Sequence, residues 1–348
     1  MRLSTQIFAY MIGLLLLGIS QNALSFSFDD PDYWAVVGNT GNASDIQTVW
    51  GQSMEFGSVD YTYRIGKYEI TTAQYVEFLN SVASYSDPRD LYNLNMSIEY
   101  NPDTLYDGIS RITNEDRCTY MANEGWENKP VVYISWYDIL RFVNWLHNGR
   151  PIGLQDTGTT EYGAYDMSFQ STNPENIVRL EGAKYWLPSE DEWYKAAYYD
   201  PDLYDGHGGY WSFPTGTNIP PDNKDPDNDT GNSANYYSAG FSVGDPYYST
   251  AVGAYGNSIS PYGTYDQAGN VWEWNESLIG INRSLRGGSW PNPLFNLSAS
   301  NRNYYLPTAE SYHIGARIAG KYEPCAIPEP LTLVLLSASL IFFVYHKR

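Results

Sequence analysis

Cysteine, histidine and basic residues are scarce in this chain of 348 residues. It contains two cysteines and four histidines, and 20 lysines and arginines stand against 40 aspartates and glutamates, a formal net charge of -20. Two cysteines allow at most one disulfide, which excludes a disulfide-bonded scaffold. The negative charge repels phosphate backbones, so nucleic acid is a poor partner. Bound divalent cations would relieve part of that repulsion.

The N-terminal segment is typical of a secretory signal peptide. Arg2 precedes an apolar run at 8–19, and the small residues Ala23 and Ser25 follow at the distance of a cleavage site. An uncleaved membrane anchor is the alternative, but the run is short for a bilayer span. We therefore expect residues 1–25 to be removed.

The C-terminal segment predicts a membrane-directed signal. Pro-Glu-Pro at 328–330 precedes an uncharged stretch at 331–345 and a basic end at 346–348. A helix of that length reaches about 22 Å, short of a ~30 Å hydrocarbon core, and its basic end is expected to stay cytoplasmic. Residues 325–348 resemble the PEP-CTERM sorting signal of Gram-negative bacteria, which implies an exosortase as processing partner. A buried C-terminal helix is the alternative.

The two ends together predict export across the inner membrane to the cell envelope. There the C-terminal segment anchors the protein or is cut to release it, and the pattern does not distinguish these outcomes. Cys118 and Cys325 can form the single disulfide that the composition allows. Cys325 stands in the linker just before the C-terminal signal, so pairing stays open.

Three helices are predicted by capping boxes. Thr71, Ser135 and Ser189 are each followed three residues later by Gln, Asp or Glu, and then by apolar residues at helical spacing. Only a few short strands are evident, at 61–65 and 131–134.

The stretch 200–261 is rich in Gly, Pro, Asn and Asp, a composition that normally indicates disorder. Tyrosine, tryptophan and phenylalanine nevertheless recur through it. We therefore expect ordered, irregular loops that fold onto the core. With few backbone ladders, their stability requires metal ions or dense aromatic packing.

Seven segments occur in an order that resembles the formylglycine-generating enzyme family, also called the sulfatase-modifying factor domain. They are YRIGKYEITTAQYVEFLN, PVVYISWYDILRFVNWL, WLPSEDEWYKAAYY, YWSFPTGTN, YGTYDQAGNVWEW, LRGGSW and HIGAR. The resemblance covers residues 32–320. It implies an α+β fold for residues 26–324, a single domain with little regular secondary structure that is related to C-type lectins.

The family's oxidase chemistry requires two cysteines shortly after the GGS motif, which bind copper and oxidise a sulfatase cysteine. In this sequence those positions are Asn292 and Leu297. Thiolate ligation is what selects Cu(I), and an amide and an aliphatic side chain cannot supply it. Cys118 and Cys325 lie outside the motif. We therefore expect neither copper nor formylglycine-generating activity.

A second catalytic branch of the superfamily makes carbon-sulfur bonds with iron held by three histidines. In this chain His147, His207 and His313 stand singly, without the HxxxH spacing. A lone histidine is more often structural or exposed than a metal ligand. The sequence disfavours this branch as well.

The resemblance implies calcium as a structural cofactor, because the family's ligand positions carry oxygen donors here. In one set the donors are the Asp266 and Glu273 carboxylates with the Gly269 and Val271 carbonyls. In the second set they are the Asn235 and Asp245 side chains with the Tyr236 and Tyr247 carbonyls. Read without the resemblance, these residues cap turns in a Gly-rich loop. The acidic run 225–229 does not match an EF-hand and reads as a solvated loop.

In the resembling enzymes the region after GGS borders the substrate cleft. The corresponding ligand-binding candidates are Trp290, Asn292, Arg302 and Asn303. Our leading hypothesis is a non-catalytic family member that binds a polysaccharide or a peptide there. One alternative is a different oxidation or hydrolysis that uses Glu310, His313 or Arg302. Another is a structural matrix protein.

Overall fold

The computed structural model describes residues 27–170 and 174–324. The expected signal peptide at 1–25 and the expected sorting signal at 325–348 lie outside these ranges, as does Cys325, whose pairing with Cys118 the sequence left open. Among the described residues, no helix has the length and apolar character needed to cross a membrane.

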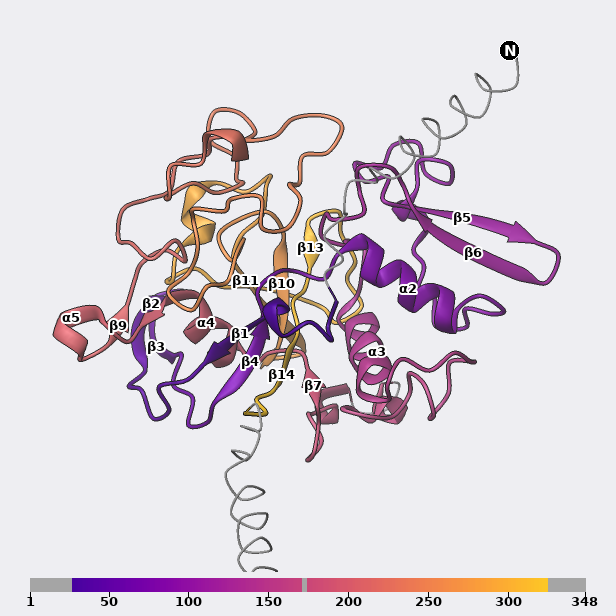
Figure 1. The fold of residues 1–348 in the computed structure, drawn as a ribbon, viewed down its shortest axis with the longest axis horizontal. Coiled ribbons are helices and arrows are strands. Elements are labelled where there is room, and N and C mark those ends of the chain that lie inside the picture. Colours follow the sequence, from indigo (N-terminus) through magenta and orange to yellow (C-terminus); the bar gives the residue numbers. More distant parts are fainter. Residues whose placement is uncertain (1–26, 171–173, 325–348) are drawn as a thin grey trace, which may run out of the picture.

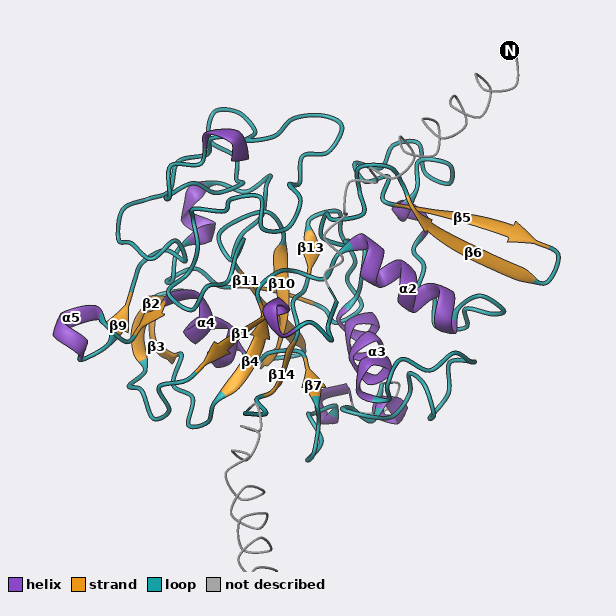
Figure 2. Ribbon diagram, viewed as in Figure 1, coloured by secondary structure: helices purple, strands orange, loops and turns teal. Residues whose placement is uncertain are grey.

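Three α-helices begin at the predicted capping boxes (Figure 2). They are α2 (Thr72–Val82), α3 (Trp136–His147) and α4 (Glu190–Tyr198). In each, the N-cap hydroxyl accepts from the backbone of the third helical residue, whose side chain accepts from the N-cap N–H. The shorter helices are α5 (Leu203–Gly206), η1 (Pro31–Tyr33), η2 (Leu94–Met96), η3 (Met167–Phe169), η4 (Pro174–Asn176), η5 (Pro226–Asn228) and η6 (Leu294–Leu297).

A four-stranded antiparallel sheet brings the two ends of the domain together. Its strands, in spatial order, are β1 (Trp34–Val37), β4 (Tyr63–Gly66), β14 (Ala319–Lys321) and β7 (Tyr185–Trp186). The strand expected at 61–65 is confirmed as β4, which begins two residues later.

A second four-stranded sheet carries the motifs of the C-terminal half. Its order is β12 (Asn303–Tyr305), β11 (Asn282–Arg286), β10 (Trp272–Ile279) and β13 (Ile314–Gly315), with β10 and β13 parallel. Three hairpins complete the strands: β2 (Asp45–Val49) with β3 (Gln52–Phe56), β5 (Ile109–Asn114) with β6 (Arg117–Ala122), and β8 (Tyr199–Asp200) with β9 (Gly209–Tyr210).

Residues 131–134 form no strand, which corrects the prediction. Val131 N donates to Ile70 O at 2.9 Å and Tyr133 N donates to Ser311 O at 3.0 Å, so the segment bonds to two separate loops. The φ of Tyr133 is 58°, in the left-handed region, which interrupts an extended backbone. The apolar run is therefore a buried connection into α3.

The stretch 200–261 is ordered and largely irregular, as expected. Two of its tyrosines pack inward and donate to loop carbonyls. Tyr236 Oη donates to Pro221 O and Tyr255 Oη donates to Lys224 O, each at 2.8 Å. Both rings are buried. Aromatic packing thus holds these loops where strand ladders are missing.

The core lies between the helices and the second sheet. The rings of Phe78 in α2 and Phe142 in α3 meet edge to face at 5.4 Å. Trp274 of β10 donates its indole N–H to Ile134 O at 3.2 Å, and Trp136 of α3 donates to Asn275 O at 3.1 Å. Figure 1 shows the result, with α2, α3 and the projecting β5–β6 hairpin on one side, the orange loops on the other, and β10 and β13 between.

Candidate functional site

The segment after β11 turns sharply at two glycines. Gly287 and Gly288 have φ values of 102° and 78°, a region that side chains rarely adopt. A Cβ on Gly288 would lie 2.8 Å from Leu297 Cδ1. The turn therefore needs glycine both for its backbone and for its close packing on η6.

Asn292 takes the first of the two positions that carry cysteine in the resembling enzymes. Its Oδ1 accepts from Trp272 Nε1 at 2.7 Å and from Ser289 Oγ at 2.5 Å. Its backbone carbonyl accepts from Tyr237 N at 2.9 Å. The amide is thus held against β10 and has a structural role in this turn.

Leu297 takes the second position and is fully buried. It packs in a small apolar cluster with Phe213, Ala234, Tyr236 and Ala268. Neither position carries a sulfur atom, and the Leu297 side chain occupies the second position with an apolar group. The observed side chains therefore do not fit a Cu(I) ion, because the thiolates that would hold it are missing.

Next to Asn292 five aromatic rings form a continuous group, which we call the aromatic shelf: Tyr237, Phe241, Tyr248, Trp290 and Tyr312. Tyr248 and Trp290 stack at 4.7 Å, and Phe241 meets both at 5.0 and 5.5 Å. Tyr237 packs on Phe241 at 5.1 Å, and Tyr312 lies 5.5 Å from Trp290. The loop 237–248 and the turn after β11 together position the shelf.

The shelf presents only some of its rings to solvent. Tyr237 and Phe241 are 42% and 45% exposed, whereas Trp290 is 5% exposed. Trp290, a ligand-binding candidate from the sequence, is therefore the floor of the shelf. Tyr237 and Phe241 are the more exposed rings of the shelf.

Arg302 and Asn303, the other candidates, belong to a different set of contacts. Arg302 Nη2 donates to Glu190 Oε2 at 2.5 Å, and Glu190 Oε1 accepts from Arg286 Nε at 2.7 Å. Arg302 lines an open groove of about 500 Å³ beside the β2–β3 hairpin and the start of α4. Asn303 Oδ1 accepts from the neighbouring Tyr304 N at 2.9 Å. The sequence candidates thus divide into two groups.

Glu273, an expected calcium ligand, is wholly buried and forms an ion pair with Arg317. Arg317 Nε and Nη2 donate to its two oxygens, each at 2.6 Å, and Trp193 Nε1 donates at 2.7 Å. Arg317 also donates to three backbone carbonyls. Both oxygens of Glu273 therefore have strong donors in the present arrangement.

Asp266, which stands with Glu273 in the first expected ligand set, is 7% exposed. Its Oδ2 accepts from Gly253 N at 2.5 Å. Burial raises the pKa of Asp266 to about 6, while the Gly253 N–H and Arg317 oppose the rise. A bound cation would stabilise the charged form of this buried carboxylate, which nearby acidic groups disfavour.

Asn235 belongs to the second expected set of calcium ligands. The residue is 1% exposed, and its Oδ1 has no hydrogen-bond partner among the described residues. Its Nδ2 donates to Tyr248 O at 2.9 Å, which leaves the oxygen side of the amide unsatisfied. Asp245 is exposed. The carbonyls of Tyr236 and Tyr247 accept from Ser242 and Ser249 respectively.

The other two donors of the first set belong to strand-like backbone. Gly269 forms an isolated bridge with Asn235, and Val271, fully buried, leads into β10. Asn270 between them joins the two sets, because its N donates to Asn235 O at 2.8 Å. The described residues contain no group of three or more His, Cys, Asp or Glu that could hold a metal by those side chains alone. Amide and carbonyl oxygens would have to complete any calcium site.

Sequence reasoning missed Glu69, which is fully buried just before the α2 cap. Its Oε1 accepts from Asn270 Nδ2 at 2.9 Å, and its Oε2 has no partner among the described residues. Burial raises the pKa of Glu69 well above its usual range, and the charge of Asp266 adds to this. The available signal was the position of Glu69 next to Ile70, inside the motif YRIGKYEITTAQYVEFLN and just before the predicted cap.

The three histidines outside the tail do not converge. His313 Nδ1 lies 2.8 Å from Ser311 Oγ, and burial lowers its pKa to about 4, so its ring is neutral. His147 Nδ1 accepts from Lys184 N at 3.2 Å, and His207 is exposed beyond α5. These contacts give each histidine a separate environment.

Two curated relatives share part of this sequence. The hercynine oxygenase of Mycolicibacterium smegmatis is 31% identical over 157 residues, and that of Mycobacterium tuberculosis is 30% identical over 153 residues. Each match covers 38% of this chain and 32% of the relative. This chain thus spans about a third of the length of the curated relatives it matches.

Solved structures with a similar chain path include Treponema denticola variable protein 1, CarF, and PvdO from Pseudomonas aeruginosa. Their TM-scores are 0.48, 0.48 and 0.45, with sequence identities of 19%, 19% and 17%. They cover 83% of this chain, and this chain covers 95%, 98% and 94% of them respectively.

The expected fold class, an α+β domain with little regular secondary structure, is confirmed by the elements themselves and by the family match. The family model of the sulfatase-modifying factor enzyme 1-like domain matches residues 52–322, which is well over half of the chain. The protein therefore belongs to the sulfatase-modifying factor enzyme family.

Proposed function

We propose that this chain is a non-catalytic member of its family that binds an extracellular polysaccharide at the aromatic shelf. The observation that carries the proposal is the contrast between two neighbouring features. At the two thiol positions, Asn292 accepts a hydrogen bond from Trp272 and Leu297 packs in an apolar cluster. Beside them, the rings of Tyr237 and Phe241 are exposed to solvent.

A polysaccharide suits the shelf better than a peptide does. Exposed aromatic rings offer flat apolar faces with polar edges, which match the faces of sugar rings. The formal charge of -20 disfavours acidic polymers and leaves neutral or cationic ones. A peptide ligand is the other outcome that a binding experiment can return.

Calcium is the proposed structural cofactor. The support is the unsatisfied Asn235 Oδ1 and the buried Asp266 carboxylate, on segments that Asn270 links. Bound calcium would supply positive charge inside an acidic molecule and tie the irregular loops together. Glu273 fits less directly, because Arg317 already holds both of its oxygens.

Export and envelope placement complete the proposal and rest on the sequence of the two ends. An exosortase would process the segment 325–348, and the membrane would hold the protein until that step. Finding the uncharged stretch 331–345 in protein isolated from its native cell would contradict processing.

Two measurements test the proposed function. Incubation with Cu(I), a reductant and a cysteine-containing sulfatase peptide should yield no formylglycine by mass spectrometry, and measurable product would overturn the non-catalytic assignment. A glycan array probed with the mature protein should show binding to neutral or amine-bearing polysaccharides. Binding restricted to peptides would replace the polysaccharide with a peptide ligand.

A second candidate is an oxygenase related to the hercynine oxygenases, which the 31% identity favours. The separate environments of His147, His207 and His313 speak against an iron centre built from histidine. Elemental analysis of the purified protein discriminates the two candidates. Stoichiometric iron would favour the oxygenase, and calcium without iron would favour the binding protein.

A further inference from the structure

A second recess adjoins the aromatic shelf. It is a pocket of about 280 Å³ whose walls include Tyr106, Trp126, Tyr247 and Tyr248, with Asp107 and Asp245 among its lining residues. Tyr248 is shared, because it also stacks on Trp290 in the shelf at 4.7 Å. The shelf and the pocket therefore share one wall.

The aromatic walls are held in place before any ligand binds. Tyr106 and Trp126 meet at 4.6 Å and 71°, and Trp126 and Tyr247 meet at 5.4 Å and 68°. Tyr106 Oη lies 2.7 Å from Thr72 Oγ1 at the start of α2. Rings that are already fixed lose little conformational entropy on binding.

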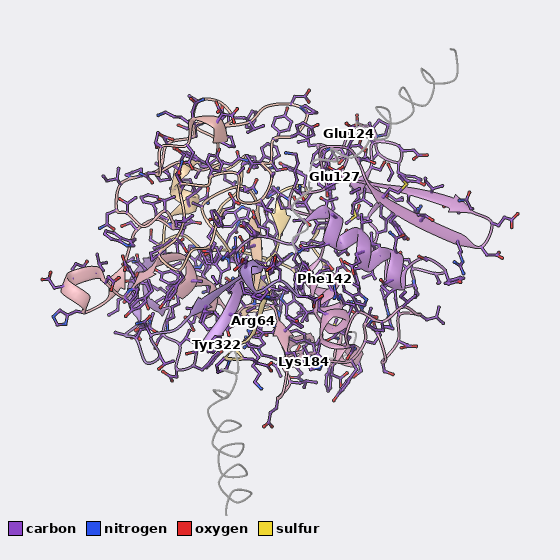
Figure 3. All side chains as sticks on the ribbon, viewed as in Figure 1. Arg64, Glu124, Glu127, Phe142, Lys184 and Tyr322 are labelled. Atoms are coloured by element: carbon purple, nitrogen blue, oxygen red, sulfur yellow. The ribbon has the colours of Figure 1, made fainter. Side chains whose placement is uncertain are left out.

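Acidic side chains outnumber basic ones around these walls. Asp107 and Asp245 line the pocket, whereas Glu124 and Glu127, labelled in Figure 3, are near Trp126 in the sequence and do not line it. Asp245 is also an expected calcium ligand, which leaves Asp107 as the carboxylate for a ligand. The loop of Trp126 packs closely on Tyr247, since a Cβ on Gly125 would lie 2.6 Å from Tyr247 Oη.

Lys129 is the basic side chain placed against the same rings. Its Nζ lies 4.4 Å from the centroid of Tyr247 and donates to Ser249 O at 2.7 Å. The side chain is buried, and burial lowers its pKa to about 8. The fold therefore already places an ammonium group on one ring of this wall.

Aromatic rings and carboxylates together recognise an organic cation that also has apolar surface. We propose that the pocket binds the free, protonated amine of an amino-sugar residue in the polysaccharide that lies on the shelf. This rests on the proposed function and narrows its ligand to a polysaccharide with unacetylated amines. The size of the pocket suits one sugar residue.

Calorimetric titration of the mature protein with two matched oligosaccharides tests the proposal. One is a glucosamine hexasaccharide, at a pH where its amines are protonated, and the other is the N-acetylglucosamine hexasaccharide. We expect the amine form to bind about tenfold more tightly, because only it carries charge. Equal affinities, or tighter binding of the acetylated form, would overturn the proposal while leaving polysaccharide binding intact.

The variant Asp107→Asn assigns the preference to this pocket. Asp107 Oδ1 accepts from Ile98 N at 3.0 Å, and an asparagine oxygen can keep that bond, so the fold is retained. Asp107 is also outside the expected calcium ligands. We expect the preference for the amine form to fall at least threefold in Asp107→Asn.

Asp227→Asn is the matched control, because it removes the same charge from an exposed position in η5. It should keep the preference of the wild type. If both substitutions reduced the preference for the amine form equally, the cause would be the overall charge of the protein, and the assignment to this pocket would be wrong. Failure of both oligosaccharides to bind the wild type would overturn this inference, and the glycan array decides separately whether any other polysaccharide binds.

Discussion

At the scale of single residues, many polar and charged side chains are buried and hydrogen-bonded inside this loop-rich protein. Arg317 and Glu273 are both fully buried and make two charge-assisted bonds at 2.6 Å. Arg317 also binds the carbonyls of Gly66, Lys67 and Tyr265. One side chain thus ties the first sheet, the loop before β10 and β10 itself together.

We predict that Arg317→Met destabilises the protein by about 3–5 kcal/mol, because it leaves the Glu273 carboxylate buried without its partner. The measurement is the free energy of unfolding from urea denaturation. Arg150→Gln is the control, since Arg150 pairs with Asp29 at the surface and should cost less than about 1 kcal/mol. Similar losses for both variants would contradict the role of the buried pair.

The exposed shelf residues should affect binding and not folding. We predict that Tyr237→Ala and Phe241→Ala each weaken glycan affinity by about threefold to tenfold, because each removes an exposed stacking face. Tyr85→Ala, which removes a 59% exposed ring beyond the end of α2, should leave affinity unchanged. If all three variants bind as the wild type does, the ligand lies elsewhere. Affinity is measured by calorimetry.

At the scale of elements, each helix cap forms between residues close in sequence, but the caps differ in how deeply they are buried. The Asp138 cap of α3 is 3% exposed, and its Oδ2 accepts from Ser135 N at 2.8 Å and Ser135 Oγ at 2.6 Å. Burial raises the pKa of Asp138 to about 8, and the nearby Glu310 charge adds to the rise. A cap that favours its protonated form makes α3 sensitive to pH.

The sign of that sensitivity follows from linkage. Burial raises the pKa of Asp138 from about 3.9 in the unfolded chain to about 8 in the folded protein, and Asp138 shares this titration with Glu310, whose pKa burial also raises. This contribution to stability is therefore complete below about pH 4 and is lost as the pH rises toward 8, at no more than about 1.4 kcal/mol for each pH unit. We predict that urea denaturation at several pH values shows wild-type stability falling relative to Asp138→Asn. Parallel curves for the two proteins would refute this.

At the scale of the whole molecule, both the excess of negative charge and the shortage of regular secondary structure favour bound calcium. The loops of 200–261 have few ladders, and the chain carries twice as many acidic as basic residues. Divalent cations bound at the two expected ligand sets, one with Asp266 and one with Asn235, would add positive charge and hold the loops together.

We predict that a calcium chelator lowers the melting temperature by several degrees, because calcium at 100 times its Kd adds about 2.7 kcal/mol. In Asp266→Asn the calcium-dependent part of the shift should be smaller, because this substitution alters one of the two expected ligand sets. Asp227→Asn, in the exposed acidic run, should retain it. The measurement is calorimetry with calcium or with chelator, and identical melting temperatures of the wild type in both would exclude a structural calcium site.

Much of the fold could be predicted from the sequence because its strongest signals are local. Thr71, Ser135 and Ser189 form their caps with residues three positions away, so neighbours in the chain suffice. The segment 131–134 was read incorrectly as a strand, because its hydrogen bonds go to Ile70 and Ser311, which no local pattern identifies. Glu69 was missed for the same reason, since Asn270, its partner, lies 201 positions away.

The sequence by itself determined the family, the replacement of both thiol positions by Asn292 and Leu297, and the acidic balance, because each depends only on which residues are present and in what order. The tertiary structure decided which residues meet. It buried Trp290, exposed Tyr237 and Phe241, and brought Asp107 beside Tyr247 and Tyr248. Such encounters depend on the paths of irregular loops, which dense aromatic packing fixes only when the whole chain has folded.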